Sequence, residues 1–205
     1  MEYAASQIQL RGTLMNEPEF SHENHGKSFY RFLLEVPRLS GTSDILPIIT
    51  ESSHILQLNS PGTMLFITGQ VRSHNIRSDG KRHLLVFVFA TNIVCEDAEP
   101  LNDCIIEGYL CREPIYRKTP MGREICDIML AVPRTYRRAD YLPCILWGKT
   151  ARQMSQCHTQ DKICIIGRLQ SRTYTKQTDF GAEKRTTYEI SALSAQVILD
   201  SDSEL

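Results

Sequence analysis

The sequence lacks the local signatures of the common enzyme classes. It contains no P-loop, no G-x-G-x-x-G fingerprint and no nucleophile elbow, and its Ser, His and Asp residues are scattered. His22 and His25 lie three residues apart beside Glu23, but no third ligand is placed near them, so this segment is interpreted as a polar loop. We therefore predict no enzymatic activity, no metal and no cofactor.

Long apolar runs are also missing. No stretch approaches the roughly 20 residues needed to span a bilayer, and the N-terminus M-E-Y-A-A-S-Q has neither the basic nor the apolar region of a signal peptide. The seven cysteines are an odd number without a C-x-x-C pair, and several lie in apolar, strand-like runs. Buried free thiols in a reducing cytoplasm explain this pattern.

Charge is nearly balanced over the chain but unevenly placed. Residues 104–198 hold fifteen Lys and Arg against nine Asp and Glu, whereas residues 7–94 hold eight against seven. The remaining segments hold eight acids and no base, which brings the net charge to −1. A basic second half predicts a polyanionic partner for that half.

An internal duplication organises the chain. A shift of 96 places residues 8–51 on residues 104–147 without a gap, with 13 identities in 44 positions. Because several identities are turn residues with special backbone needs, chance is a poor explanation. Matching pairs include Gly12 with Gly108, Arg38 with Arg134 and Asp44 with Asp140.

Each repeat reads as five strands with one short helix between the third and fourth. In the first repeat we expect strands at Ile8–Met15, Ser28–Val36, Ile45–Thr50, Thr63–Ser73 and Leu84–Val94, and a helix at Ser53–Leu58. In the second we expect strands at Cys104–Cys111, Glu124–Val132, Tyr141–Trp147, Lys162–Tyr174 and Thr187–Leu199, and a helix at Thr150–Gln156. Polar hairpin loops join the last two strands. This plan predicts an all-β protein of two tandem five-stranded OB-fold barrels.

The segment Asp127–Lys149 carries the clearest binding pattern. Its candidates are the cations Arg134, Arg137 and Arg138 and the rings Tyr136, Tyr141 and Trp147. Guanidinium groups bind phosphates and aromatic rings stack on unpaired bases, so the pattern is typical of a surface for single-stranded nucleic acid. Aromatic residues on strands are often core residues, however, so this stretch alone leaves both interpretations open.

Further motifs are spread through the whole second repeat. They are Gly108-Tyr109-Leu110 with Pro114, Thr119-Pro120-x-Gly122, Leu130-Ala131-Val132-x-Arg134-Thr135-Tyr136, Tyr141-x-x-Cys144-Ile145-x-Trp147, Gly167-Arg168-Leu169-Gln170-Ser171-Arg172-x-Tyr174, and Thr187-Tyr188-Glu189. In this order and spacing, over some 95 residues, they resemble the bacterial single-stranded DNA-binding protein family.

The resemblance implies an OB barrel that wraps single-stranded DNA without strong sequence preference, in replication, recombination or repair. It implies base stacking on Tyr136, Trp147 and Tyr174, with Tyr141 as a fourth candidate. It implies phosphate contacts at Arg134, Arg168 and Arg172, and the neighbouring Arg137, Arg138 and Lys176 extend this surface. Since the family normally acts with four barrels together, the duplication predicts that two chains pair as a homodimer.

The first repeat keeps the scaffold and loses the aromatic positions. Glu51 stands where Trp147 stands, and a carboxylate there repels phosphate. The other replacements are Ser40 for Tyr136, Ile45 for Tyr141 and Ile76 for Tyr174. This repeat is therefore either structural or binds by another face. Such a face would hold Arg72, Arg77, Lys81 and Arg82, with a solvated hairpin as the alternative.

These observations predict a degenerate OB-fold domain at 1–95, an acidic linker at 96–103, an OB-fold domain at 104–199 and a short acidic tail at 200–205. The tail lacks the aromatic-terminated motif of the family, so we expect a frayed terminus. We expect a cytoplasmic, nucleoid-associated protein that works with replication or recombination proteins. A protein-interaction module and an RNA-binding OB protein remain open, and contacts to the 2′-hydroxyl distinguish RNA.

Overall fold

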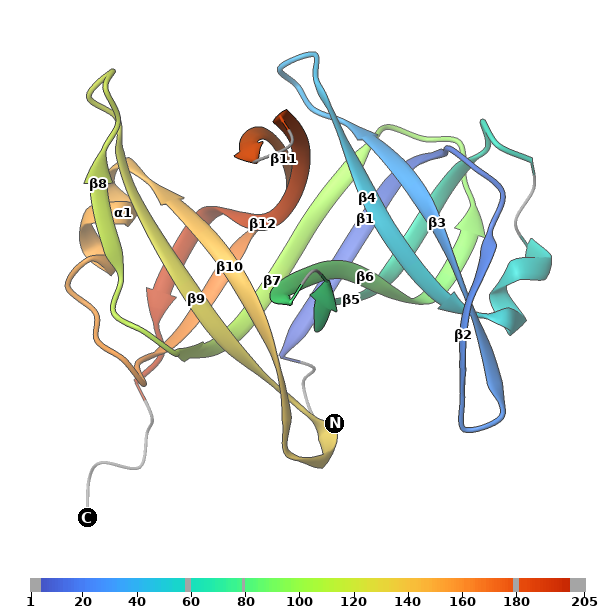
Figure 1. Cartoon of the computed structure of the whole chain (residues 1–205), viewed down its shortest axis with the longest axis horizontal. Coiled ribbons are helices and arrows are strands. Elements are labelled where there is room, and N and C mark those ends of the chain that lie inside the picture. Colours follow the sequence, from blue (N-terminus) through green and yellow to red (C-terminus); the bar gives the residue numbers. More distant parts are fainter. Residues whose placement is uncertain (1–4, 58–59, 79, 179–180, 200–205) are drawn as a thin grey trace. The chain divides into compact units, whose positions relative to one another are not determined.

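The computed structural model describes residues 5–57, 60–78, 80–178 and 181–199 (Figure 1). These residues form two compact units. The N-terminal unit contains Gln7–Asp103 and Leu169–Glu189, and the C-terminal unit contains Cys104–Arg168 with the described residues up to Ser6 and from Ile190 onward. Leu169–Glu189 is therefore part of the second repeat in sequence but part of the N-terminal unit in space.

The first repeat forms a barrel of five strands with one added edge strand. Its elements are β1 (Ser6–Leu14), β2 (Glu19–Asn24), β3 (Lys27–Pro37), β4 (Ser43–Glu51), the 3₁₀ helix η1 (Ser52–Gln57), β5 (Met64–Ser78) and β6 (Lys81–Cys95). Strands β3, β4, β6, β5 and β1 are neighbours in that order, and β1 also pairs with β3. This second pairing closes the barrel, whereas β2 pairs with β3 alone.

The second repeat has the same plan. Its elements are β7 (Leu101–Leu110), β8 (Ile115–Lys118), β9 (Glu124–Arg134), the 3₁₀ helix η2 (Thr135–Arg137), β10 (Arg138–Trp147), the α-helix α1 (Gly148–Met154), β11 (Lys162–Thr178) and β12 (Gly181–Val197). Strand β7 pairs with both β11 and β9, which closes this barrel. In each barrel the third and fifth barrel strands run parallel, as β4 with β6 and β10 with β12.

The five-stranded barrels were predicted, and three details differ. Strands β2 and β8 lie where only turns were expected. The helix of the first repeat is a 3₁₀ helix, and Leu58, expected at its end, lies outside the described residues. Residues 101–103, expected in the linker, already belong to β7.

The barrel cores follow the alternation of the strands. Ile128, Leu130 and Val132 are buried, as their spacing in the sequence predicted. Asp44 and Asp140 occupy inward positions at the start of β4 and near the start of β10, and each is only 1% exposed. Buried carboxylates need hydrogen-bonding partners, so these two positions must be paired within the protein.

Two duplicated glycines mark the points where the barrels close. A Cβ atom on Gly12 would lie 2.3 Å from the carbonyl oxygen of Glu35, and one on Gly108 would lie 2.8 Å from that of Ala131. These contacts are too short for any side chain. The identity of the two glycines therefore follows from the crossing of the first barrel strand over the second.

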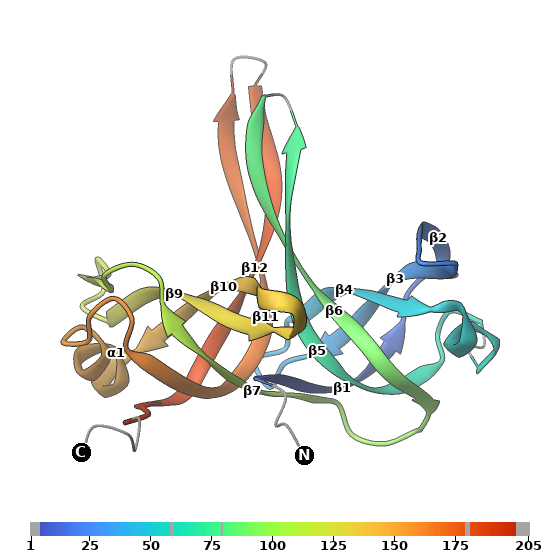
Figure 2. The ribbon, with the colours of Figure 1, turned by 90° about the horizontal axis from the view of Figure 1, so that it is seen from below.

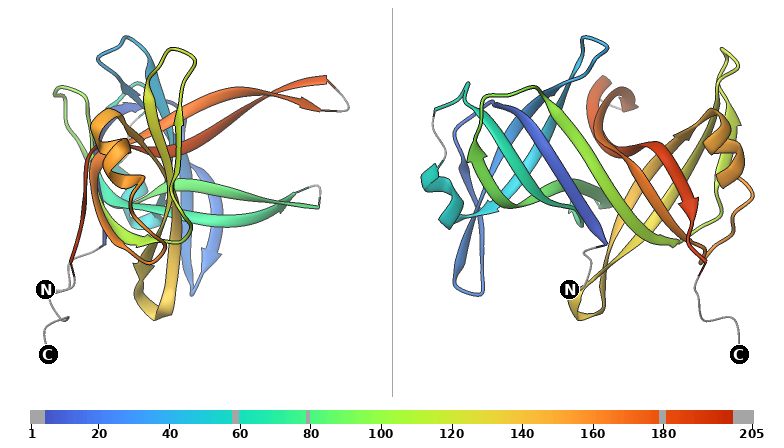
Figure 3. Two further views of the ribbon diagram at one scale, coloured as in Figure 1. Left: turned by 90° about the vertical axis from the view of Figure 1, so that its left-hand side faces the viewer. Right: turned by 180° about the vertical axis from the view of Figure 1, so that it is seen from behind.

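Each repeat carries a long hairpin that extends beyond the barrel strands (Figure 2, Figure 3). Strand β5 pairs with β6 out to Ser78 and Lys81, and β11 and β12 contain 17 residues each. The polar loops expected here are therefore mostly strand, because cross-strand pairing continues past the barrel. We name these outer parts the β5–β6 arm (residues 72–87) and the β11–β12 arm (Leu169–Glu189).

None of the seven cysteines forms a disulfide. The prediction of buried free thiols is confirmed for Cys104, Cys126, Cys144 and Cys157, whereas Cys95 and Cys111 are exposed and Cys164 is partly buried. Burial raises the pKa of the Cys126 thiol to about 11. The exposed pair lies at strand ends, where side chains leave the barrel core.

Candidate nucleic-acid interface

Strands β9 and β10 form an antiparallel pair around the basic, aromatic turn η2. Their register runs from Arg134 opposite Arg138 to Ile125 opposite Trp147. Tyr136 lies within η2, and its side chain is outside the described part of the structure. Arg137 follows with a φ of 53°, a left-handed conformation that turns the chain sharply into β10.

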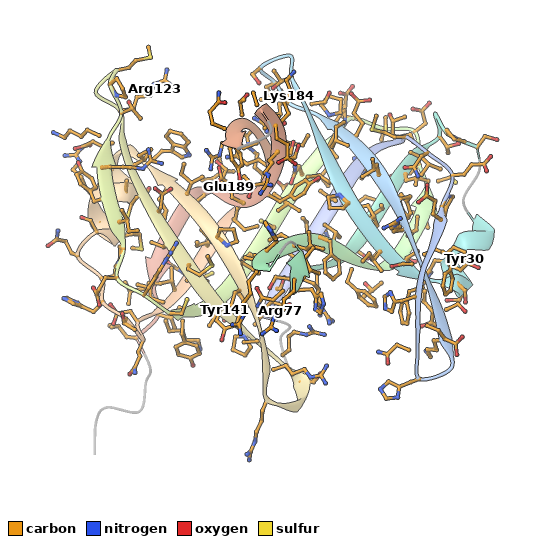
Figure 4. All side chains as sticks on the ribbon, in the orientation of Figure 1. Tyr30, Arg77, Arg123, Tyr141, Lys184 and Glu189 are labelled. Carbon is orange, nitrogen blue, oxygen red and sulfur yellow. The ribbon has the colours of Figure 1, made fainter. Side chains whose placement is uncertain are left out.

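The aromatic residues of β10 point out of the barrel. Tyr141 and Trp147 are six residues apart, so the twofold period of a strand puts them on one face, about 20 Å apart along the strand. Tyr141 is 43% exposed and Trp147 is 40% exposed, whereas the neighbouring Leu142 and Leu146 are buried. Figure 4 shows Tyr141 on this strand. Neither ring is a core residue, which removes one of the two interpretations that the sequence left open.

The Trp147 ring is anchored at one edge. Its Nε1 donates a hydrogen bond to Oγ of Ser191 at 3.4 Å, and Ser191 is buried on β12. The polar edge of the indole is therefore satisfied within the protein, while part of the ring remains in contact with solvent. A half-exposed ring held at a fixed edge is suited to stacking on a flat ligand.

The three arginines of the turn have different surroundings. Arg134 donates a hydrogen bond from Nη1 to the buried Asp140 at 3.4 Å. Arg137 and Arg138 are exposed, and neither side chain has an acidic partner among the described residues. Arg138 also lies directly opposite Arg134, and like charges in that position repel. The turn therefore presents two uncompensated cations to solvent.

The remaining predicted residues lie on β11. Tyr174 is 42% exposed, and the guanidinium of Arg172 lies 5.9 Å from the centre of its ring. Arg172 also approaches Glu189 at 3.6 Å, an acid that accepts a hydrogen bond from Gln170. Tyr174 and Arg172 belong to the N-terminal unit, so the structure groups them apart from Tyr141 and Trp147.

Arg168 and Lys176 are the other two predicted cations of β11. Arg168 ends the second segment of the C-terminal unit, and its Nε is buried without a hydrogen-bond partner among the described atoms. An unsatisfied buried donor is costly, and this nitrogen is not at the surface. The side chain of Lys176 lies outside the described part of the structure.

An anchor that the sequence did not reveal holds the base of the β11–β12 arm. The backbone N–H of Ser171 donates to Asp44 Oδ1 at 2.6 Å, and its Oγ lies 3.2 Å from the same oxygen. Arg38 donates to both oxygens of Asp44, and also to the carbonyl oxygen of Ser171 at 2.9 Å. The hydrogen bond with Asp44 raises the pKa of Arg38. The first repeat thus secures the strand that carries Arg172 and Tyr174.

Glu51 confirms the degeneracy of the first repeat. It lies opposite Phe29 in β3, as Trp147 lies opposite Ile125 in β9, so the two positions are equivalent. The carboxylate of Glu51 is paired with Lys27 at 2.9 Å. The aromatic side chains of this barrel stack on one another instead, with His22 4.8 Å from Phe29 and nearly parallel to it.

Other site chemistries find no support in the described residues. Among them, no three His, Cys, Asp or Glu side chains gather as a metal site would require. No helix of the described chain is long and apolar enough to cross a membrane.

Comparison with known proteins extends the resemblance. The model of the single-strand binding protein family matches residues 101–198. Single-stranded DNA-binding protein 1 of Staphylococcus aureus (strain COL) is 33% identical over 84 residues, which cover 38% of this chain and 50% of that protein. Single-stranded DNA-binding protein B of Bacillus subtilis (strain 168) is 31% identical over 83 residues, which cover 37% of this chain and 74% of the relative. The chain spans about half the length of the curated Staphylococcus aureus relatives that it matches.

The fold comparison covers both repeats. The crystal structure of the wild-type single-stranded DNA binding protein from Thermus aquaticus matches with a TM-score of 0.79 at 23% identity, over 98% of this chain and 96% of that one. This likeness confirms the predicted fold of two OB barrels. The family follows from the match to the Bacillus relative, which is covered to 74% of its length, and from the match to the family model. The chain is a member of the single-strand binding protein family, built as a tandem duplication with a degenerate first repeat.

Proposed function

We propose that this chain binds single-stranded DNA without strong sequence preference and does not act as an enzyme. The observation that carries the proposal is the outward pair Tyr141 and Trp147 on β10, the strand that begins with the uncompensated Arg138 directly after Arg137. Each exposed ring on this face can stack on an unpaired base, and guanidinium groups of the same strand pair neutralise phosphates. Membership of the family, whose relatives are named single-stranded DNA-binding proteins, supports DNA as the polymer.

The β11–β12 arm adds a second set of contacts in this proposal. Tyr174 supplies a ring of similar exposure, and Arg172 lies close to it. Tyr136, Arg134, Arg168 and Lys176 complete the proposed set. Each stacked base contributes about 1–3 kcal/mol, and each neutralised phosphate adds about 0.7 to the salt slope of binding to a single strand.

The proposed role is sequestration of exposed single strands during replication, recombination or repair, at the nucleoid. We propose the domain division 1–95, 96–103 and 104–199, in which the second barrel carries the main site. We also propose that two chains pair so that four barrels act together, because the duplication supplies two barrels per chain. Sedimentation that finds only monomers at working concentrations contradicts the pairing.

Fluorescence anisotropy of a labelled oligo-dT tests the proposed site. Trp147→Ala should weaken binding about 5- to 150-fold, which corresponds to the loss of one stacked base. Tyr116→Ala is the matched control, because Tyr116 is an exposed tyrosine of the same barrel that lies on β8 and hydrogen-bonds Glu124. Equal affinities of the two variants would refute the site. A matched oligo-rU that binds more tightly than oligo-dT would favour RNA.

A further inference from the structure

Half of the eight cations of the first repeat are neutralised by acids within the protein. Four of them form ion pairs: Arg11 with Glu96, Lys27 with Glu51, Arg31 with Glu19 and Arg38 with Asp44. A fifth, Arg72, donates two hydrogen bonds to Gln70 and lies over the ring of Phe89. Such partners occupy the guanidinium and ammonium groups, so these positions offer little to an external anion.

Arg77 and Arg82 are different. They lie directly opposite each other in the register of β5 and β6, and both are exposed. Neither side chain has an acidic partner among the described residues. Figure 4 shows Arg77 on the β5–β6 arm. The side chain of Lys81, the other cation predicted for this face, is outside the described part of the structure.

The opposition of two arginines is unfavourable for the isolated hairpin. Directly opposite residues have Cβ atoms about 4.5–5.5 Å apart, and like charges at that distance repel. A carboxylate would relieve the repulsion, as it does elsewhere in this repeat, but none of the described residues supplies one. An external polyanion relieves it equally well, because two guanidinium forks then face closely spaced negative charges.

We propose that Arg77 and Arg82 form a phosphate-binding site for single-stranded nucleic acid on the β5–β6 arm of the first repeat. The site holds the backbone without reading or stacking bases, since Ile76 stands where the second repeat has Tyr174. The degenerate repeat then contributes affinity through charge alone. This inference rests on the proposed binding of single strands by the chain.

The salt dependence of binding tests the site. The variant Arg77→Gln/Arg82→Gln removes two charges and retains polar side chains. Its control, Lys27→Gln/Arg31→Gln, removes the same charge from the same repeat, but at paired positions. Both are measured by anisotropy with labelled oligo-dT of about 30 nucleotides, long enough for more than one OB barrel.

The expected result is a salt slope lower by about 1.4 in Arg77→Gln/Arg82→Gln than in the parent, from two lost phosphate contacts. With equal affinities at 1 M salt, this slope corresponds to about tenfold weaker binding at 0.2 M. The control should keep the parental slope. A slope in the test variant equal to that of the control overturns the inference, whereas a parent that binds no oligo-dT overturns the proposed function itself.

Discussion

Removal of the Asp44 carboxylate should release the β11–β12 arm and destabilise the N-terminal unit. Asp44 is 1% exposed. It accepts hydrogen bonds from the backbone N–H of Ser171 and from Nε and Nη2 of Arg38. Asp44→Ala leaves the guanidinium of Arg38, whose side chain is 21% exposed, without its counter-charge. It also removes the acceptor of the Ser171 N–H.

Breaking a buried ion pair from one side costs about 3–5 kcal/mol. Since Arg38 keeps some contact with water, we expect the lower end, about 3 kcal/mol. Glu19→Ala is the matched control, because it breaks an ion pair with Arg31 in which both side chains are 64% exposed. Surface changes of this kind stay within about 0.5 kcal/mol of the parent.

Two measurements distinguish the loss of the contact between Asp44 and Ser171 from a general loss of stability. Urea unfolding gives the change in the free energy of unfolding, and hydrogen exchange of Ser171 and the following amides reports the opening of the arm. We expect faster exchange at 171–174 in Asp44→Ala, even under conditions where the barrel amides stay protected. Unfolding free energies of Asp44→Ala and Glu19→Ala that agree within error would refute the anchor.

Three further outcomes follow from the same structure. Arg137→Gln/Arg138→Gln should lower the salt slope of oligo-dT binding by about 1.4, and an unchanged slope would mean that these cations only face solvent. A thiol reagent at pH 8 should modify the exposed Cys95 and Cys111 before the four buried cysteines, as peptide mapping can check. Because burial raises the pKa of Cys126 to about 11, only the unfolded thiol ionises as pH rises from about 9. Stability should therefore fall between pH 9 and 11, less so in Cys126→Ala, and an equal fall in both proteins would contradict this.

Much of the fold was predictable because the repeat supplied the same pattern twice. Gly12 and Gly108 recur since the barrel closes over a backbone carbonyl, and the inward spacing of Ile128, Leu130 and Val132 recurs in the first repeat. The lengths of the strands that form the two arms were underestimated. Their outer strands are polar on both faces, so they carry no hydrophobic alternation and resemble loops in the sequence.

The candidate site was only partly visible in the sequence. The sequence alone placed Trp147 and Tyr141 on one strand, but their outward direction depends on which strand face the barrel buries. It also aligned Arg38 with Arg134 as equivalent cations. Arg38, however, also donates a hydrogen bond to the carbonyl oxygen of Ser171, a contact across 133 positions of the chain that no local pattern encodes.

The most direct test of the account is a titration of the single tryptophan, Trp147, with oligo-dT at several salt concentrations. A base stacked on the half-exposed indole should quench its fluorescence strongly, and the midpoint should move to higher oligonucleotide concentration as salt rises. Unchanged Trp147 fluorescence, while anisotropy at the same concentrations detects no complex, would contradict the proposed binding of single-stranded DNA.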